Sequence, residues 1–201
     1  MAGTARGRHD GKSVREAIFA AALALAAEHG ITGTTMDDIA ARAGVAKGSL
    51  YYNFASKDQL FADLLDEALS TLSDRLKTAR QGRTGLGAVR ALFETILQAM
   101  QENPDLARVL VAEIFRDDRS WVQTVAAHRE QFLSELQHSC EEAGAAAGQQ
   151  LPHPDIVAAG LLGAALTVGL EWRLTGVKVP REQVVDSALD GLGTVLSAPA
   201  D

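Results

Sequence analysis

The chain has 201 residues, of which 47% are hydrophobic and 22% are charged, and its formal net charge is −7. This composition fits a soluble protein of one or two domains with a sizeable core. The single cysteine, Cys140, excludes an internal disulfide and fits a reducing cytoplasm. The longest apolar stretch, Ile156 to Leu170, is shorter than the roughly 20 residues that span a bilayer, and no signal peptide precedes Ser13. We therefore expect a cytoplasmic protein without a membrane span.

Helix starts and ends are clearly marked along the chain. Residues 1–12 are charged and contain glycine, so we expect a disordered arm. Capping-box patterns begin at Ser13, Thr35, Ser56 and Ser120, and glycines suit the helix ends. No segment alternates with the period of a strand. The sequence therefore predicts an all-α fold of about nine helices, over residues 13–30, 37–43, 47–54, 57–80, 86–102, 104–117, 120–147, 154–175 and 181–197.

The segment from Thr34 to Phe61 has the spacing of a helix-turn-helix. Ala40, Gly44 and Leu50 stand at relative positions 0, +4 and +10. They supply a small residue where two helices cross, a glycine for the sharp turn, and an apolar residue that ties the second helix to the core. The spacing alone also fits any helical hairpin, but the whole segment is more specific.

This segment resembles the N-terminal domain of the TetR family (TetR/AcrR-like) of bacterial transcriptional regulators. The similarity covers about residues 13–62. Ala26, Ala46 and Asn53 depart from the family's usual phenylalanine, serine and histidine. The residues that carry the similarity are Ala22 to Gly30, Thr34-Thr35, Ile39-Ala40, Ala43-Gly44-Val45, Lys47-Gly48, Leu50-Tyr51-Tyr52, Phe54, Lys57 and Leu60-Phe61.

The resemblance implies a three-helix DNA-binding domain over residues 13–62, with its helix-turn-helix at about 35–54. A C-terminal effector-binding and dimerisation domain follows over residues 63–201. The net charge is +1 for residues 1–60 and −8 for the remainder, so an acidic distal part is compatible with a head that binds phosphates. The alternative for the two tyrosines is packing in the small core. The predicted DNA contacts are Thr35, Lys47, Gly48, Ser49, Tyr51, Tyr52 and Lys57.

An apolar stripe follows steps of three and four residues along 120–147. Such stripes are more often plain core than pocket, but the resemblance implies an effector pocket in the distal helices. A pocket of this kind is mostly apolar with a few polar anchors. The candidate anchors are His128, Arg129, Glu113, Thr167 and Glu171. The predicted pocket residues are Phe93, Ile96, Met100, Phe115, Trp121, Val125, His128, Phe132, Leu166 and Trp172.

The helix predicted over 154–175 is apolar nearly all round, so it must be covered on all sides. Gly160 and Gly163 permit a close helix–helix approach, either within one chain or between two chains. The resemblance implies a homodimer through the last two helices. The predicted interface residues are Leu161, Ala165, Val168, Val185, Leu189 and Leu192.

The five histidines form no pair at helical spacing, and no phosphate loop or catalytic triad pattern is present. We therefore predict no catalytic residue, no metal and no cofactor. The expected function is a ligand-responsive DNA-binding regulator, a repressor on a pseudo-palindromic operator that a small, largely apolar effector releases. The alternatives are a helical enzyme without a recognisable motif and an all-helical interaction protein.

Overall fold

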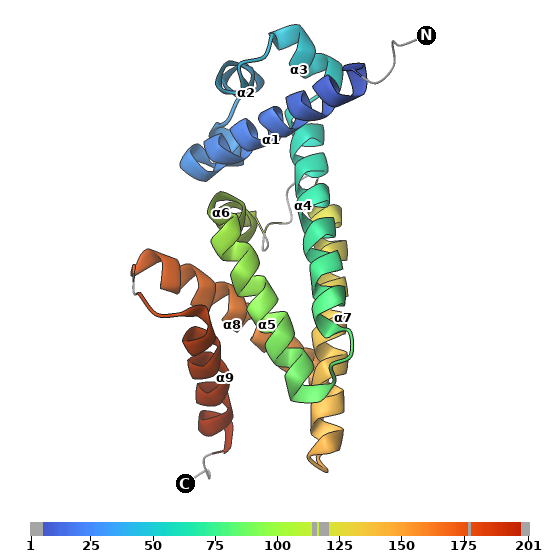
Figure 1. Ribbon diagram of the computed structural model, residues 1–201, viewed down its shortest axis with the longest axis vertical. Helices are drawn as coiled ribbons and strands as arrows, with labels where there is room; N and C mark the ends of the chain where they lie inside the picture. Colours follow the sequence, from blue (N-terminus) through green and yellow to red (C-terminus); the bar gives the residue numbers. More distant parts are fainter. Residues whose placement is uncertain (1–5, 114–115, 117–120, 177, 198–201) are drawn as a thin grey trace. The chain divides into compact units, whose positions relative to one another are not determined.

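The computed structural model describes residues 6–113, 116, 121–176 and 178–197, and side chains from Val14 to Gly191 within these ranges. The described residues form α-helices and no strand (Figure 1), which confirms the predicted all-α fold. The helices are α1 Arg6–Gly33, α2 Met36–Ala43, α3 Lys47–Asn53, α4 Lys57–Arg80, α5 Gly85–Glu102, α6 Pro104–Glu113, α7 Val122–Ala146, α8 Pro154–Leu174 and α9 Arg181–Ser197.

The first helix differs from the prediction at its start. It begins at Arg6, so residues 6–12 are helical where composition predicts a disordered arm, and Ser13 lies inside the helix instead of capping it. Adding a residue to an existing helix gains one hydrogen bond for one ordered residue, so a helix with a buried face extends easily. At its other end α1 runs to Gly33, beyond the predicted end at residue 30, but Gly30 itself leaves the helical conformation with φ 72° and forms a kink there.

The chain divides into two compact units. The first contains Met1–Ala68 and Asp105–Val125, and the second contains Leu69–Pro104 and Ala126–Asp201. The first unit is therefore larger than the predicted domain of residues 13–62. Within this unit the rings of Phe61 and Trp121 lie 6.1 Å apart, and both side chains are almost fully buried.

In the first unit, α1, α2 and α3 enclose a small core. Ile18, Ile39, Leu50 and Phe54 are completely buried there. The turn between α2 and α3 is built as the spacing predicts. Gly44 has φ 67°, a left-handed conformation that glycine adopts without steric cost, and the amides at the turn bond back to the last carbonyls of α2.

In the second unit, α5 packs its apolar face against α8 and α9. The contact with α8 is close at Gly169, where an added Cβ would lie 2.5 Å from Sδ of Met100. An ion pair from Arg90 to Asp186 ties α5 to α9. Arg80 of α4 bonds Glu142 of α7 at 3.1 Å, and Glu142 accepts a second bond from the first amide of α5. These contacts fix the helices of this unit around one another.

Candidate DNA-binding site

The second helix of the pair, α3, separates its side chains into a buried and an exposed face. Leu50 and the following Phe54 are completely buried, whereas Tyr51 is 45% exposed and Tyr52 is 91% exposed. The alternative in which both tyrosines pack into the core is therefore wrong. Large aromatic side chains this exposed on a short helix are available to bind another molecule.

The start of α2 is fixed by a cap. The amide of Asp38 donates to Oγ1 of Thr35 at 3.2 Å, and this hydroxyl donates to a carboxylate oxygen of Asp38 at 2.5 Å. The helix start predicted at Thr35 is confirmed, with Thr35 as the N-cap, and its side chain stays exposed. An exposed threonine thus stands directly before the first turn of α2.

Lys47 and Gly48 begin α3, and both are exposed. The ammonium of Lys47 lies 2.8 Å from the carboxylate of Asp37, and this hydrogen bond raises the pKa of Lys47. Apart from its chain neighbours and the backbone of its own helix, no atom of the described residues lies within 4 Å of the place where a Cβ would stand at Gly48. Packing within the chain therefore does not require glycine there, whereas close approach of another molecule would. Ser49 is half-buried next to it.

Lys57 differs from the other predicted contacts because its ammonium is already engaged. It donates to the carbonyls of Ile31 at 3.0 Å, Thr32 at 3.3 Å and Thr34 at 2.8 Å. An ammonium has three N–H donors, so all of them are used. Lys57 therefore holds the connection from α1 to α2, where carbonyls at a helix end lack helical partners.

Sequence reasoning missed two arginines that support this face. Arg42 of α2 makes a bidentate pair with Glu28 of α1, at 2.7 and 2.9 Å, and this hydrogen bond raises the pKa of Arg42. The guanidinium of Arg15 lies 4.5 Å from the ring centroid of Phe19 and 5.1 Å from that of Phe54. These partners are far apart in sequence and follow no local pattern, so no signal in the sequence identifies them.

The predicted pocket residues are divided between the two units. Trp121 and Val125 belong to the first unit, and Phe115 lies outside the described residues. In the second unit, Phe93, Ile96 and Met100 share the buried face of α5, and Phe132 is buried on α7. Leu166 and Trp172 are half-buried on α8. Nδ1 of His128 lies 3.3 Å from the buried hydroxyl of Ser73. The apolar cavity stays a prediction.

The residues predicted for a dimer interface also differ in exposure. Ala165 and Val185 are completely buried within the single chain, so they pack α8 and α9 internally and offer no surface to a partner. Leu161, Val168 and Leu189 are half-buried, and the side chain of Leu192 lies outside the described ones.

The capped α2, the turn at Gly44 and the exposed face of α3 place the first unit in the class of helix-turn-helix domains. Residues 18–64 match the family described as bacterial regulatory proteins, tetR family. Residues 18–64 therefore form a domain of the tetR-family type, which confirms the resemblance seen in this part of the sequence.

One curated relative is the nucleoid occlusion factor SlmA of Glaesserella parasuis serovar 5 (strain SH0165), 31% identical over 96 residues. The match covers 47% of this chain and 48% of the relative, so the chain spans about half the length of the curated relatives it matches.

Solved structures share the fold of nearly the whole chain. FadR of Bacillus subtilis in complex with stearoyl-CoA has a TM-score of 0.74 at 18% identity and covers 92% of this chain and 99% of its own. AibR in complex with isovaleryl coenzyme A and operator DNA has a TM-score of 0.75 at 19% identity, and the match covers 87% of this chain and 95% of the AibR chain.

Proposed function

We propose that the protein is a DNA-binding transcriptional regulator, a repressor whose release from DNA is controlled by a small molecule. The observation that carries the proposal is the face of α3, on which Tyr51 and Tyr52 are exposed while Leu50 holds the helix to the core. The family match of residues 18–64 supports it. So does the likeness in fold to AibR, which is in complex with a coenzyme A thioester and operator DNA.

In this proposal α3 enters the major groove. Gly48 lets the backbone approach closely, and Lys47 and Ser49 lie at the start of the helix, where base edges are read. Thr35, Tyr51 and Tyr52 contact phosphates, which set the position of the protein on DNA without reading the sequence. Lys47 exchanges its bond with Asp37 for a phosphate or a base. Lys57 takes no direct part, because it holds the connection before α2.

A homodimer through α8 and α9 completes the proposal. By length and composition alone α8 is apolar enough to cross a membrane, yet little of it is buried within the chain. Ile156 is 64% exposed and Leu174 is 67% exposed. A second copy of the chain would remove this apolar surface from water in a cytoplasmic protein. A two-fold dimer would present two copies of α3 about 34–36 Å apart, one turn of DNA, to a pseudo-palindromic operator.

The effector in this proposal is small and largely apolar. Phe93, Ile96 and Met100 on α5 and Phe132 on α7 supply apolar side chains within one unit. The likeness in fold to FadR of Bacillus subtilis, which is in complex with stearoyl-CoA, supports an effector with an apolar chain. Binding that prefers one conformation of the distal helices would lower DNA affinity by linkage.

Fluorescence anisotropy with the DNA upstream of the protein's own gene tests the DNA-binding proposal. We expect the wild type to bind this DNA more tightly than a scrambled duplex, with an affinity that falls as salt rises. Tyr52→Ala should weaken binding to both duplexes by a similar factor, about tenfold, because it removes a phosphate contact. The matched control is Leu86→Ala, an exposed apolar residue of the second unit.

Two results would contradict the proposal. The first is equal affinity of the wild type for the upstream DNA, fragments selected from the genome and the scrambled duplex. The second is a folded Tyr52→Ala variant with full affinity, which would remove the face of α3 from the interface.

A further inference from the structure

An open groove of about 520 Å³ lies between α4 and α5, entirely within the second unit. It is lined by Thr71, Asp74, Arg75, Thr78, Ala79, Thr95 and Gln98. None of these residues was predicted to bind a ligand from the sequence. The groove is also separate from the apolar face of α5 that carries Phe93 and Met100, because those two side chains are buried in the core.

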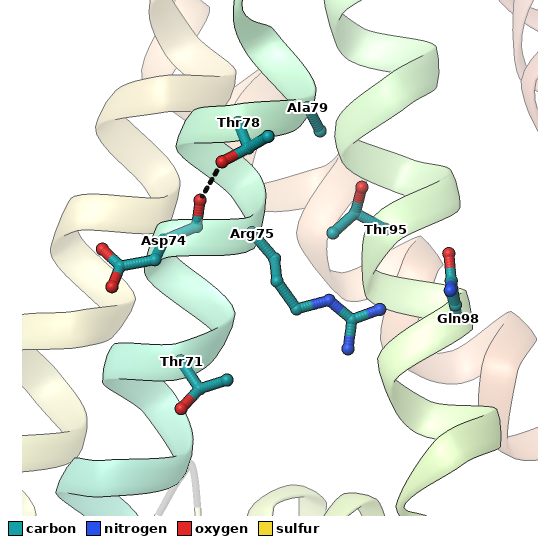
Figure 2. Close-up of a pocket in the computed structure, with 7 residues that line it drawn as sticks. All are labelled: Thr71, Asp74, Arg75, Thr78, Ala79, Thr95 and Gln98. Atoms are coloured by element: carbon teal, nitrogen blue, oxygen red, sulfur yellow. Dashed lines mark hydrogen bonds between the residues drawn. The ribbon is translucent and has the colours of Figure 1, made fainter.

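Arg75 is the only cation among the residues that line this groove. Figure 2 shows its side chain extending from α4 toward α5, with Ala79 one turn along α4 and Thr95 on the facing helix. Its Nη1 donates to Glu102 at 2.6 Å. Nε and Nη2 donate to no other described residue. These two atoms form the side edge of the guanidinium, which matches the two oxygens of a carboxylate or phosphate.

Small side chains leave room in front of this edge. Ala79 and three threonines form most of the wall. The hydroxyls of Thr78 and Thr95 donate to carbonyls of their own helices, at 2.9 and 2.7 Å. A hydroxyl that has donated its hydrogen can still accept a bond. The groove thus has one strong pair of donors, at Arg75, beside hydrogen-bond acceptors.

The acidic groups near the groove leave room for an anion. Glu102 is held by Arg75 on one oxygen and by the amide of Gln98 on the other, at 2.7 Å. These two bonds, and the nearby charge of Arg181, lower the pKa of Glu102. The side chain of Asp74 is 82% exposed, and Figure 2 shows its carboxylate on the side of α4 that faces away from α5.

We propose that this groove binds a small molecule through a carboxylate or phosphate group, which the free Nε–Nη2 edge of Arg75 holds by two hydrogen bonds. Donor groups next to the anion, such as hydroxyl or amino groups, bond the threonine oxygens and the amide oxygen of Gln98. Glu102 orients the guanidinium and competes weakly with the ligand. The site needs neither DNA nor the apolar effector.

Titration with acetate and, separately, with inorganic phosphate at constant ionic strength tests the site on the full chain without DNA. The Nε–H resonance of Arg75 in nitrogen–proton spectra reports binding directly. We expect this resonance to shift and saturate, whereas that of Arg83, which lies outside the groove, stays in place. The two arms show whether carboxylate or phosphate is preferred.

Three variants give the expected pattern. Arg75→Lys keeps the positive charge but loses the paired N–H donors of the guanidinium edge, so affinity for the anion should fall about tenfold. Ala79→Leu should also weaken binding by filling the space beside Arg75. Glu102→Gln should strengthen binding several-fold, because it removes the competing charge. Isothermal calorimetry compares these with the matched control Arg83→Lys, which should bind like the wild type.

Each contrary result overturns the proposal. Unchanged anion affinity in Arg75→Lys would mean that the Nε–Nη2 edge does not hold the anion. An equal loss in Arg83→Lys would mean that anions bind this surface only through general charge. No shift of the Arg75 resonance with either anion would leave the groove without an anion site. None of these results depends on whether the protein binds DNA.

Discussion

Replacing Lys57 by methionine tests how the DNA-binding unit is held together. The change keeps most of the aliphatic side chain but removes all three bonds to the carbonyls of Ile31, Thr32 and Thr34. A hydrogen bond to a charged group contributes about 1.5–3 kcal/mol. Water can replace the ammonium at the exposed carbonyl of Thr32 and in part at the other two. We therefore expect a loss of about 3 kcal/mol in the free energy of unfolding.

Urea and thermal unfolding measure this loss. For a chain of this size, about 3 kcal/mol corresponds to a fall in melting temperature of roughly 6–12 °C. The matched control is Lys77→Met on the same helix. Its side chain is 51% exposed and its ammonium lies 3.9 Å from Asp74, so this variant should stay within about 0.5 kcal/mol of the wild type.

The salt dependence of DNA binding separates the two roles of Lys57. A phosphate contact contributes about 0.9 to the slope of log affinity against log salt, whereas a residue that only positions the backbone contributes nothing. We expect Lys57→Met to bind DNA more weakly with an unchanged slope. A Lys57→Met variant with full stability and a salt slope that is smaller by about 0.9 would refute this reasoning. It would mean that Lys57 contacts a DNA phosphate directly.

Two further predictions concern the second unit. Leu189→Glu on α9 should convert a dimer into monomers in light scattering and abolish operator binding, and a monomeric wild type at micromolar concentration would contradict it. Glu142→Gln should lower the melting temperature at neutral pH. The amide of Gly85 and the charge of Arg80 lower the pKa of Glu142 in the folded protein. The ionised carboxylate therefore stabilises the fold above the pKa that Glu142 has in the unfolded chain, and this stabilisation is lost as the pH falls through its pKa in the folded protein. The melting temperatures of the variant and the wild type should therefore become equal at acid pH. The control Glu130→Gln, on the same helix, should have the melting temperature of the wild type at every pH. A difference between Glu142→Gln and the wild type that persists at acid pH would exclude this charge effect.

The helix boundaries follow from the sequence because their signals are local. Thr35 and Ser56 each bond the amide three residues later, and Gly44 adopts the left-handed turn that its spacing predicts. Ser13 carries the same pattern but lies inside α1, since a cap pattern does not prevent a helix from starting earlier. A local signal thus predicts that a helix is present better than it predicts where that helix begins.

The candidate sites depend on contacts that no local pattern encodes. Tyr52 is exposed, whereas the ammonium of Lys57 is bonded to carbonyls at the connection that precedes α2. The DNA contacts predicted for both residues stay predictions. Trp121 joins the first unit through Phe61. In the sequence, nothing distinguishes Arg75 from other charged residues on helices. The structure shows that Glu102 bonds one end of its guanidinium and that the Nε–Nη2 edge is free.

The helix α4 contributes to both units, with Lys57 in the first and Arg75 in the second. Lys57 supports the connection into the helix-turn-helix, and Arg75 ties α4 to α5 through Glu102. An anion on the free edge of Arg75 would share the charge of the guanidinium with Glu102, the partner through which Arg75 ties α4 to α5. If that change alters DNA affinity, linkage requires operator DNA to alter anion affinity by the same factor. If the anion does not change DNA affinity, DNA must therefore leave anion affinity unchanged as well. The groove would then be a second site that acts independently of the DNA-binding face.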